Sequence, residues 1–213
     1  YTNCIIYVPK SSVDAYKSAD VWKEYADRIV GYDFEEEIID ANTPPNNQIW
    51  YTSTDGQIVI PNNWDDTFFG ANIISNVYEN GKGVITFDGD ITEIGFRAFD
   101  LRKSLTGITI PNSVKYISYS AFCSCSITNI TIPNNVTEID SHVFLCCDKL
   151  SAFYGKFASS DNRCLIIDGC LTSFAPAGIT SYTIPEGVTS IGFAAFQLSP
   201  LKSVTIPESV TDI

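Results

Sequence analysis

The sequence predicts a mostly β solenoid with short helices, in which coils of 22 to 23 residues stack on one another. Two observations predict this fold. An apolar motif returns at nearly constant spacing, with copies that begin at residues 82, 105, 127, 150, 179 and 201. Within each copy the apolar residues alternate over a few positions, as they do in a strand with one buried face.

Each copy follows the pattern L-x-x-I-x-I-P-x-x-V-x-x-I-x-x-x-A-F. The first part predicts a short strand, because Ile108 and Ile110 share one face and Pro111 lacks the N–H that would continue the ladder. A single coil cannot enclose its own apolar face, so stacked copies are expected to align Ile with Ile and Phe with Phe and to form a parallel sheet. The phenylalanines at the end of this pattern are Phe99, Phe122, Phe144 and Phe196, and Val143 replaces Ala before Phe144.

The chain contains Ser-Leu-Thr-Gly-Ile-Thr-Ile-Pro-Asn-Ser-Val (104–114) and Ile-Pro-Glu-Gly-Val-Thr-Ser-Ile-Gly-Phe-Ala-Ala-Phe (184–196). Both stretches resemble the repeat of the BspA-like leucine-rich repeat proteins, a family of bacterial cell surfaces. The resemblance implies a leucine-rich-repeat solenoid with a parallel sheet on its concave face, a secreted or surface location, and binding rather than catalysis. The 29-residue copy at 150–178 departs from the pattern, since it lacks both Val-x-x-Ile and Ala-Phe.

Residues 1–32 are expected to be the end and helical cap of a preceding repeat array. Residues 6–22 are similar to the cap with which such arrays often finish. Apolar side chains recur at broken helical spacing through 11–30, and Ser11 with Asp14 predicts a capping box at the start of the helix.

The next segment, 33–48, is acidic and then rich in Pro and Asn, which predicts a linker. Residues 49–81 are expected to form an N-terminal hairpin and capping region. The hairpin would pair 49–52 with 57–60 around Ser-Thr-Asp-Gly and cover the first coil. The repeat array itself is expected over 82–213, with its last copy incomplete at the C-terminus.

Composition and charge exclude several partners. Lys and Arg number 13 against 25 Asp and Glu, and a net charge of -12 opposes binding to nucleic acid and to anionic lipid. No run approaches the roughly 18 apolar residues of a membrane helix, so no direct membrane insertion is expected. No cofactor is expected. The incomplete last coil predicts self-association through that open end, because it would expose apolar side chains and a strand edge.

The cysteines are interpreted as reduced thiols that pack in the core. Cys125 and Cys147 follow a repeat Phe at the same spacing. If the Asp-Gly pair before Cys170 forms a two-residue turn, Cys170 lies opposite Ile167 and not opposite Cys164, which argues against a disulfide.

No catalytic residue and no metal site are expected. His142 is the only histidine, and its turn position carries varied residues in other copies, so a solvated turn residue is predicted. The cysteines also lack the separated C-x-x-C pairs of a zinc site. Glu93 and Glu138 lie two coils apart, about 10 Å at the usual strand spacing, and nothing nearby would raise a carboxyl pKa for acid–base catalysis.

The solvent face of the strands remains as the candidate site. It predicts an extracellular or cell-surface module for binding or adhesion to a protein or glycan, such as a host or matrix component. The alternatives are a structural spacer that presents another domain of a longer surface protein and, less favoured, a carbohydrate-active enzyme on a β-solenoid. Threonines suit strands in any case, whereas an exposed tyrosine is typical of an interface. The candidate residues on the concave strand face are Thr106, Thr109, Thr128, Asn129, Thr131, Tyr154, Thr183, Lys202 and Thr205.

Overall fold

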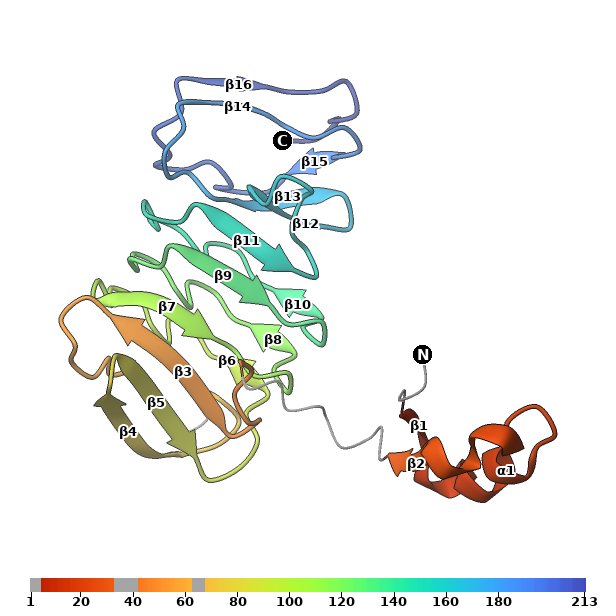
Figure 1. Cartoon of the computed structure of the whole chain (residues 1–213). Helices are drawn as coiled ribbons and strands as arrows, with labels where there is room; N and C mark the ends of the chain where they lie inside the picture. The colour runs from red at the N-terminus through yellow and green to blue at the C-terminus, as the bar shows by residue number, and fades with distance from the viewer. Residues whose placement is uncertain (1–4, 33–41, 63–67) are drawn as a thin grey trace. The chain divides into compact units, whose positions relative to one another are not determined.

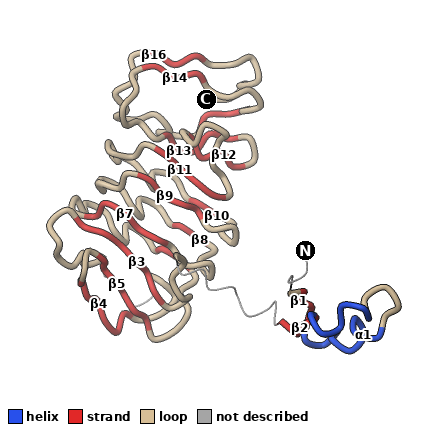
Figure 2. Tube along the Cα trace, in the orientation of Figure 1, coloured by secondary structure: helices blue, strands red, loops and turns tan. Residues whose placement is uncertain are grey.

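The computed structural model describes residues 5–32, 42–62 and 68–213. The chain divides into two compact units, Tyr1–Asn42 and Thr43–Ile213, and each is described by itself. Short strands and turns dominate the second unit, and the helices lie in the first (Figures 1 and 2).

The first unit is a short helical segment between two parallel strands. Its elements are β1 (Ile6–Pro9), the 3-10 helix η1 (Lys10–Ser12), α1 (Val13–Ser18), the 3-10 helix η2 (Lys23–Arg28) and β2 (Ile29–Tyr32). Val8 and Ile29 are the buried apolar residues of this unit in the described part of the chain. The capping box predicted from Ser11 and Asp14 does not form, because α1 begins after Ser12 and no side chain caps its N-terminus.

The second unit is the predicted stack of coils. Its strands are β3 (Gln48–Ser53), β4 (Ile73–Glu79), β5 (Lys82–Phe87), β6 (Glu93–Ile94), β7 (Leu105–Thr109), β8 (Tyr116–Ile117), β9 (Asn129–Ile132), β10 (Glu138–Ile139), β11 (Ala152–Gly155), β12 (Cys164–Ile167), β13 (Cys170–Phe174), β14 (Ser181–Thr183), β15 (Ser190–Ile191) and β16 (Ser203–Thr205). Strands β7, β9 and β11 follow one another up one side of the stack, and β6, β8 and β10 form a second parallel column (Figure 1).

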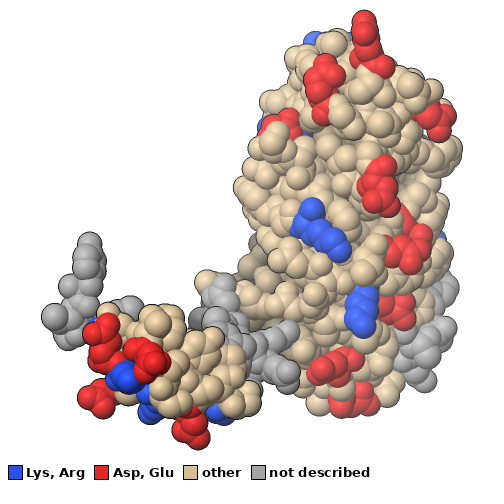
Figure 3. Space-filling model, turned by 90° about the vertical axis from the view of Figure 1, so that its right-hand side faces the viewer, with Lys and Arg blue, Asp and Glu red and all other residues tan. Residues whose placement is uncertain are grey.

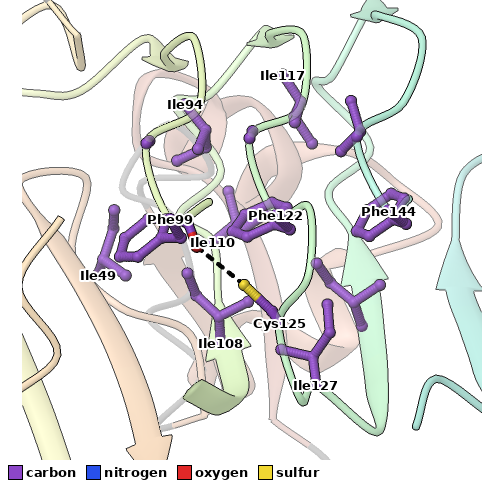
Figure 4. Packing of buried hydrophobic residues seen from close by; sticks show 14 of the residues in the cluster. Ile49, Ile94, Phe99, Ile108, Ile110, Ile117, Phe122, Cys125, Ile127 and Phe144 are labelled. Carbon is purple, nitrogen blue, oxygen red and sulfur yellow. Dashed lines mark hydrogen bonds between the residues drawn. The ribbon is translucent and has the colours of Figure 1, made fainter. Parts of the chain in front are cut away.

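The expected alignment of like with like is confirmed in the core (Figure 4). The rings of Phe99 and Phe122 stack with centroids 5.6 Å apart, and those of Phe122 and Phe144 stack at 5.7 Å. Phe99 and Phe122 are fully buried. Burying such a side chain contributes about 1.5 to 3 kcal/mol, so this column of rings is a main source of cohesion between coils.

The N-terminal end of the stack differs from the prediction. β3 does not form a hairpin with 57–60, which contains no strand; it lies between β5 and β7 and is antiparallel to both, while β4 pairs with the far edge of β5. This arrangement gives β3 a partner on each edge, where the hairpin would have supplied one.

Residues 58–62, named here the capping segment, cross the first coil in place of the predicted hairpin strand. The guanidinium of Arg102 donates to the carbonyl oxygen of Ile60, 2.6 Å away, and to the side-chain oxygen of Asn62. Asn62 in turn donates from its side chain to the carbonyl oxygens of Arg97 and Asp100.

The irregular copy at 150–178 interrupts both columns. β12 and β13 form an antiparallel hairpin in which Ile167 lies opposite Cys170, as predicted, and the turn residues Asp168 and Gly169 have φ of 50° and 80°. The other edge of β13 pairs with β15. Consequently β14 and β16 form a sheet of their own, separate from β9 and β11.

Candidate binding site

The candidate residues predicted from the sequence fall on two separate sheets. Six of them lie along β7, β9 and β11, namely Thr106, Thr109, Thr128, Asn129, Thr131 and Tyr154. The other three, Thr183, Lys202 and Thr205, lie on or beside β14 and β16, beyond the irregular copy. The structure therefore does not bring all nine onto one continuous surface.

Five of the six residues of the first group are exposed, and Thr106 is partly buried; Thr128 lies just before β9. The backbone N–H of Thr128 donates to the carbonyl oxygen of Thr106, and this offset places Thr131 beside Thr109. Tyr154 is in register with Thr131 on the next strand. The Tyr154 side chain is 44% exposed, so it is available as an anchor for a partner.

β3 adds two residues to this face that the sequence analysis missed. Trp50 is in register with Thr109, and the hydroxyl oxygens of Thr52 and Thr106 lie 2.9 Å apart. The ammonium of Lys82 lies over the Trp50 ring, 3.0 Å from its centroid. No local sequence signal indicates that β3 inserts beside β7, because alternation reveals a strand but not its neighbours.

These positions define a line across the sheet, which is named here the strand-face row and consists of Trp50, Thr109, Thr131 and Tyr154. An aromatic ring stands at each end, and two threonine hydroxyls that can donate and accept hydrogen bonds lie between them. The row can thus offer apolar contact at its ends and polar contact at its centre.

The two carboxylates considered for catalysis lie on strands that are not neighbours, β6 and β10. Glu93 and Glu138 are both in register with Tyr116, which lies between them on β8. Within the described ranges, no group of three or more His, Cys, Asp or Glu is arranged to hold a metal ion. On the face of the molecule in Figure 3, acidic side chains are spread over the coils and basic ones are few.

Burial makes the thiols of Cys125, Cys147 and Cys164 poor nucleophiles. All six cysteines in the described part of the chain are free, and burial raises the pKa of Cys125 and raises that of Cys147 to about 12. Cys164 is also buried. The prediction of packing thiols is confirmed for these three, whereas Cys123, Cys146 and Cys170 are only partly buried.

His142 lies in a turn, as predicted, with a φ of 62°, but it is partly buried and not solvated. Its ring lies between the rings of Tyr119 and Phe193, with centroids 5.0 and 5.2 Å away, and its Nδ1 is buried without a hydrogen-bond partner. The contact with Phe193 arises because the irregular copy lacks an Ala-Phe turn, so the turns of the third and fifth copies approach each other.

Comparison with known families identifies the repeat. The model of the BspA type leucine rich repeat region matches residues 72–161 and 171–213, in 6 copies. The chain belongs to the BspA-type leucine-rich repeat family. The interruption between the two matched BspA-type segments falls on the β12–β13 hairpin of the irregular copy.

Solved structures with the same BspA-type fold come from bacterial proteins. A leucine rich cell surface protein from Faecalibacterium prausnitzii is 30% identical with a TM-score of 0.52, and the match covers 58% of this chain and 35% of that one. The pneumococcal vaccine antigen PcpA is 24% identical with a TM-score of 0.51, covering 56% of this chain and 32% of that one, and it supports the fold alone. The chain thus spans about a third of each protein. No curated protein sequence matches it.

Among the described residues of this BspA-type chain, no helix is both long and apolar enough to cross a membrane.

Proposed function

We propose that this BspA-type leucine-rich repeat protein is a non-enzymatic binding module of the bacterial cell surface that holds a protein partner on its strand face. The observation that carries the proposal is the strand-face row, in which Trp50 and Tyr154 flank Thr109 and Thr131. Membership of a repeat family with a cell surface protein among its structural relatives supports the location.

The chemistry of the row favours a protein surface as the partner. Trp and Tyr are enriched among the residues that dominate binding at protein interfaces, because they bury a large area and keep a polar group. Lys82 places a positive charge on the Trp50 ring. A partner with an apolar side chain near Tyr154, backbone groups opposite Thr109 and Thr131, and an acidic group near Lys82 at the Trp50 end would match the row.

Purified chain and immobilised extracellular matrix proteins, such as collagen, laminin and fibronectin, provide a direct test by biolayer interferometry. Replacing Trp50 or Tyr154 by Ala is expected to weaken binding at least tenfold. Because Trp50 also contacts its neighbours within the sheet, Thr131→Arg serves as a second variant that blocks the exposed row without removing a packed side chain.

Thr183→Ala and Thr205→Ala are matched controls, since both threonines are exposed on the separate β14–β16 sheet. These controls are expected to bind within twofold of the unchanged chain. If the Tyr154 and Thr131 variants bind as tightly as the unchanged chain, the strand-face row is rejected as the site. An absence of binding to every matrix protein would reject the matrix-binding role and favour the structural spacer.

A further inference from the structure

The strand β4 forms the outer edge of the sheet at the N-terminal end of the stack (Figure 1). The strand order of that sheet is β4-β5-β3-β7, and in the part of the chain that the structure describes no strand pairs with the other edge of β4. With seven residues, β4 is also the longest of the described strands. A long strand with one open edge offers a row of backbone N–H and C=O groups with which another strand can pair.

The pairing inside the sheet shows which backbone groups face this open edge. The N–H of Phe87 on β5 donates to the carbonyl oxygen of Asn47, 2.9 Å away just before β3. Because the direction of hydrogen bonding alternates along a strand, Val84, three residues before Phe87, directs its backbone groups toward β4. Its partner there is Val77. The residues on either side of Val77 therefore direct their N–H and C=O groups out of the sheet, toward the open edge.

The edge of β4 carries little of the protection that usually keeps strand edges from pairing, namely Lys, Pro and bulges. The sequence of β4, Ile-Ile-Ser-Asn-Val-Tyr-Glu, contains neither Lys nor Pro, and its irregularity is confined to 73–75. In the regular part that follows, the Val77 side chain is 49% exposed beside Val84 on the solvent face of the sheet. An exposed apolar side chain on an open edge loses contact with water when another strand pairs there, which favours the pairing.

We propose that the β4 edge pairs with the same edge of a second copy of the chain, so that the two β4 strands become antiparallel neighbours in one continuous sheet. A two-fold axis brings a strand against itself in antiparallel orientation. When Val77 lies opposite Val77 of the second copy, Asn76 of each copy lies opposite Tyr78 of the other. These two residues then exchange both hydrogen bonds of a ladder pair, and the symmetry forms this pair twice.

The side chains complement one another in this register, which favours a second copy over an unrelated strand. The two Val77 residues occupy a non-hydrogen-bonded position, where Cα atoms approach to about 4.5 Å and opposite side chains interact most closely. Glu79, the one charged residue of β4, lies opposite Ser75 of the second copy, so no like charges meet. The axis is perpendicular to the sheet, so the dimer presents the strand-face rows of both copies on one side.

The strand offers a matched pair of variants for the test, since Ser75 and Val77 are both exposed on β4. Val77→Lys places two ammonium groups opposite each other in the dimer and is expected to weaken dimerisation at least tenfold. Ser75→Lys adds the same charge two residues away, but there it lies opposite Glu79 of the second copy. This variant is therefore expected to dimerise at least as tightly as the unchanged chain.

Sedimentation equilibrium of the whole chain from about 1 μM to about 1 mM measures the molar mass. About 0.15 M salt screens the repulsion between copies that each carry a net charge of -12. The mass is expected to rise with concentration from 23.4 kDa toward twice that value. A mixture of Val77→Lys and Val77→Glu is expected to dimerise at concentrations where neither variant does so alone, because opposite charges then face each other.

Thermal unfolding of each variant checks that the fold is intact. A chain that stays monomeric over the whole series overturns the proposal and leaves the β4 edge to a strand of another protein. The proposal is also overturned if Val77→Lys dimerises as tightly as the unchanged chain, which would place the contact on another surface. Equal weakening by Ser75→Lys and Val77→Lys would overturn the antiparallel register centred on Val77.

Discussion

The thiol of Cys125 donates a hydrogen bond to the carbonyl oxygen of Phe99, 3.0 Å away in the preceding coil (Figure 4). Cys147 makes the same contact with Phe122 one coil further on, also at 3.0 Å. In the first coil this repeat position holds Arg102, which donates to the capping segment. The residue three positions after the repeat Phe therefore forms a hydrogen bond that links each of these coils to the preceding coil. In the first coil the same position links the coil to the capping segment.

The burial of these thiols predicts selective chemical labelling. At pH 8 iodoacetamide is expected to react with Cys146 and Cys170 in the folded chain while Cys125, Cys147 and Cys164 stay unmodified, because burial raises the pKa of Cys125, Cys147 and Cys164 and excludes the reagent. Cys123 is expected to react more slowly than Cys146 and Cys170, because burial raises its pKa too while the residue stays partly accessible. Mass spectrometry of peptides from folded and urea-unfolded samples measures this. Rapid labelling of Cys125 or Cys147 in the folded chain would contradict their place in the core.

The stacked rings predict a large penalty for truncation. Phe122→Ala is expected to lower the free energy of unfolding by about 3 to 5 kcal/mol, because a fully buried ring between Phe99 and Phe144 would leave a cavity. Phe193→Ala is the control, and its change is expected to stay within about 0.5 kcal/mol because the ring is exposed. Urea denaturation of both variants measures these changes in the free energy of unfolding. Similar midpoints for the two variants would show that Phe122 does not lie in the core.

Arg102 is predicted to hold the capping segment in place. Arg102→Ala removes its hydrogen bonds to Ile60 and Asn62 and is expected to cost about 1 to 3 kcal/mol. Hydrogen exchange of the Asn62 amide, which donates to the carbonyl oxygen of Ala98, is expected to become faster. The exposed neighbour Lys103 provides the control variant Lys103→Ala. Unchanged exchange in the Arg102 variant would show that other contacts are sufficient.

A polar network around the exposed carboxylate of Asp161 predicts acid sensitivity in the irregular copy. Cys164 donates to the hydroxyl of Tyr182, which donates to Asp161. Burial alone would raise the pKa of Asp161, but hydrogen bonds from Ser159, from the backbone N–H of Arg163 and from Tyr182 outweigh it and lower the pKa. A carboxylate with a lowered pKa in the folded state stabilises the fold above its unfolded pKa, and that contribution is lost as pH falls through the folded value.

The measurement compares melting temperatures of the unchanged chain and of Asp161→Asn between pH 6 and pH 2.5. The variant is expected to be less stable at pH 6 and to lose less stability on acidification, so the two curves converge at low pH. Parallel curves over this range would show that Asp161 carries no pH-dependent share of the stability.

The regular coils could be predicted from the sequence because their determinants are local and repeated. Alternation at Ile108 and Ile110 marks a strand, and equal spacing aligns Phe99 with Phe122 whatever the remaining contacts are. The turn before Cys170 was also predictable, because Asp-Gly accepts positive φ with little strain.

The missed features depend on neighbours that are remote in sequence. β3 has the alternation of a strand, but its partners β5 and β7 are chosen by how three segments pack together. His142 resembles a solvated turn residue because its burial depends on Phe193, two copies away, and on the turn that the irregular copy lacks. The candidate face was divided for the same reason, since the sheet of β14 and β16 lies beyond that copy.

The position of β3 between two strands that follow it in the chain also fixes an order of events during synthesis. The ribosome releases 48–53 first, and neither edge of that segment meets its native neighbour until 82–87 and then 105–109 have emerged. By contrast, each later coil packs on a preceding coil that has already been synthesised. During that interval the nascent β3 has two bare edges and is open to pairing with a strand of another chain. We therefore expect this end of the repeat unit to be the part of the nascent protein that most needs a chaperone.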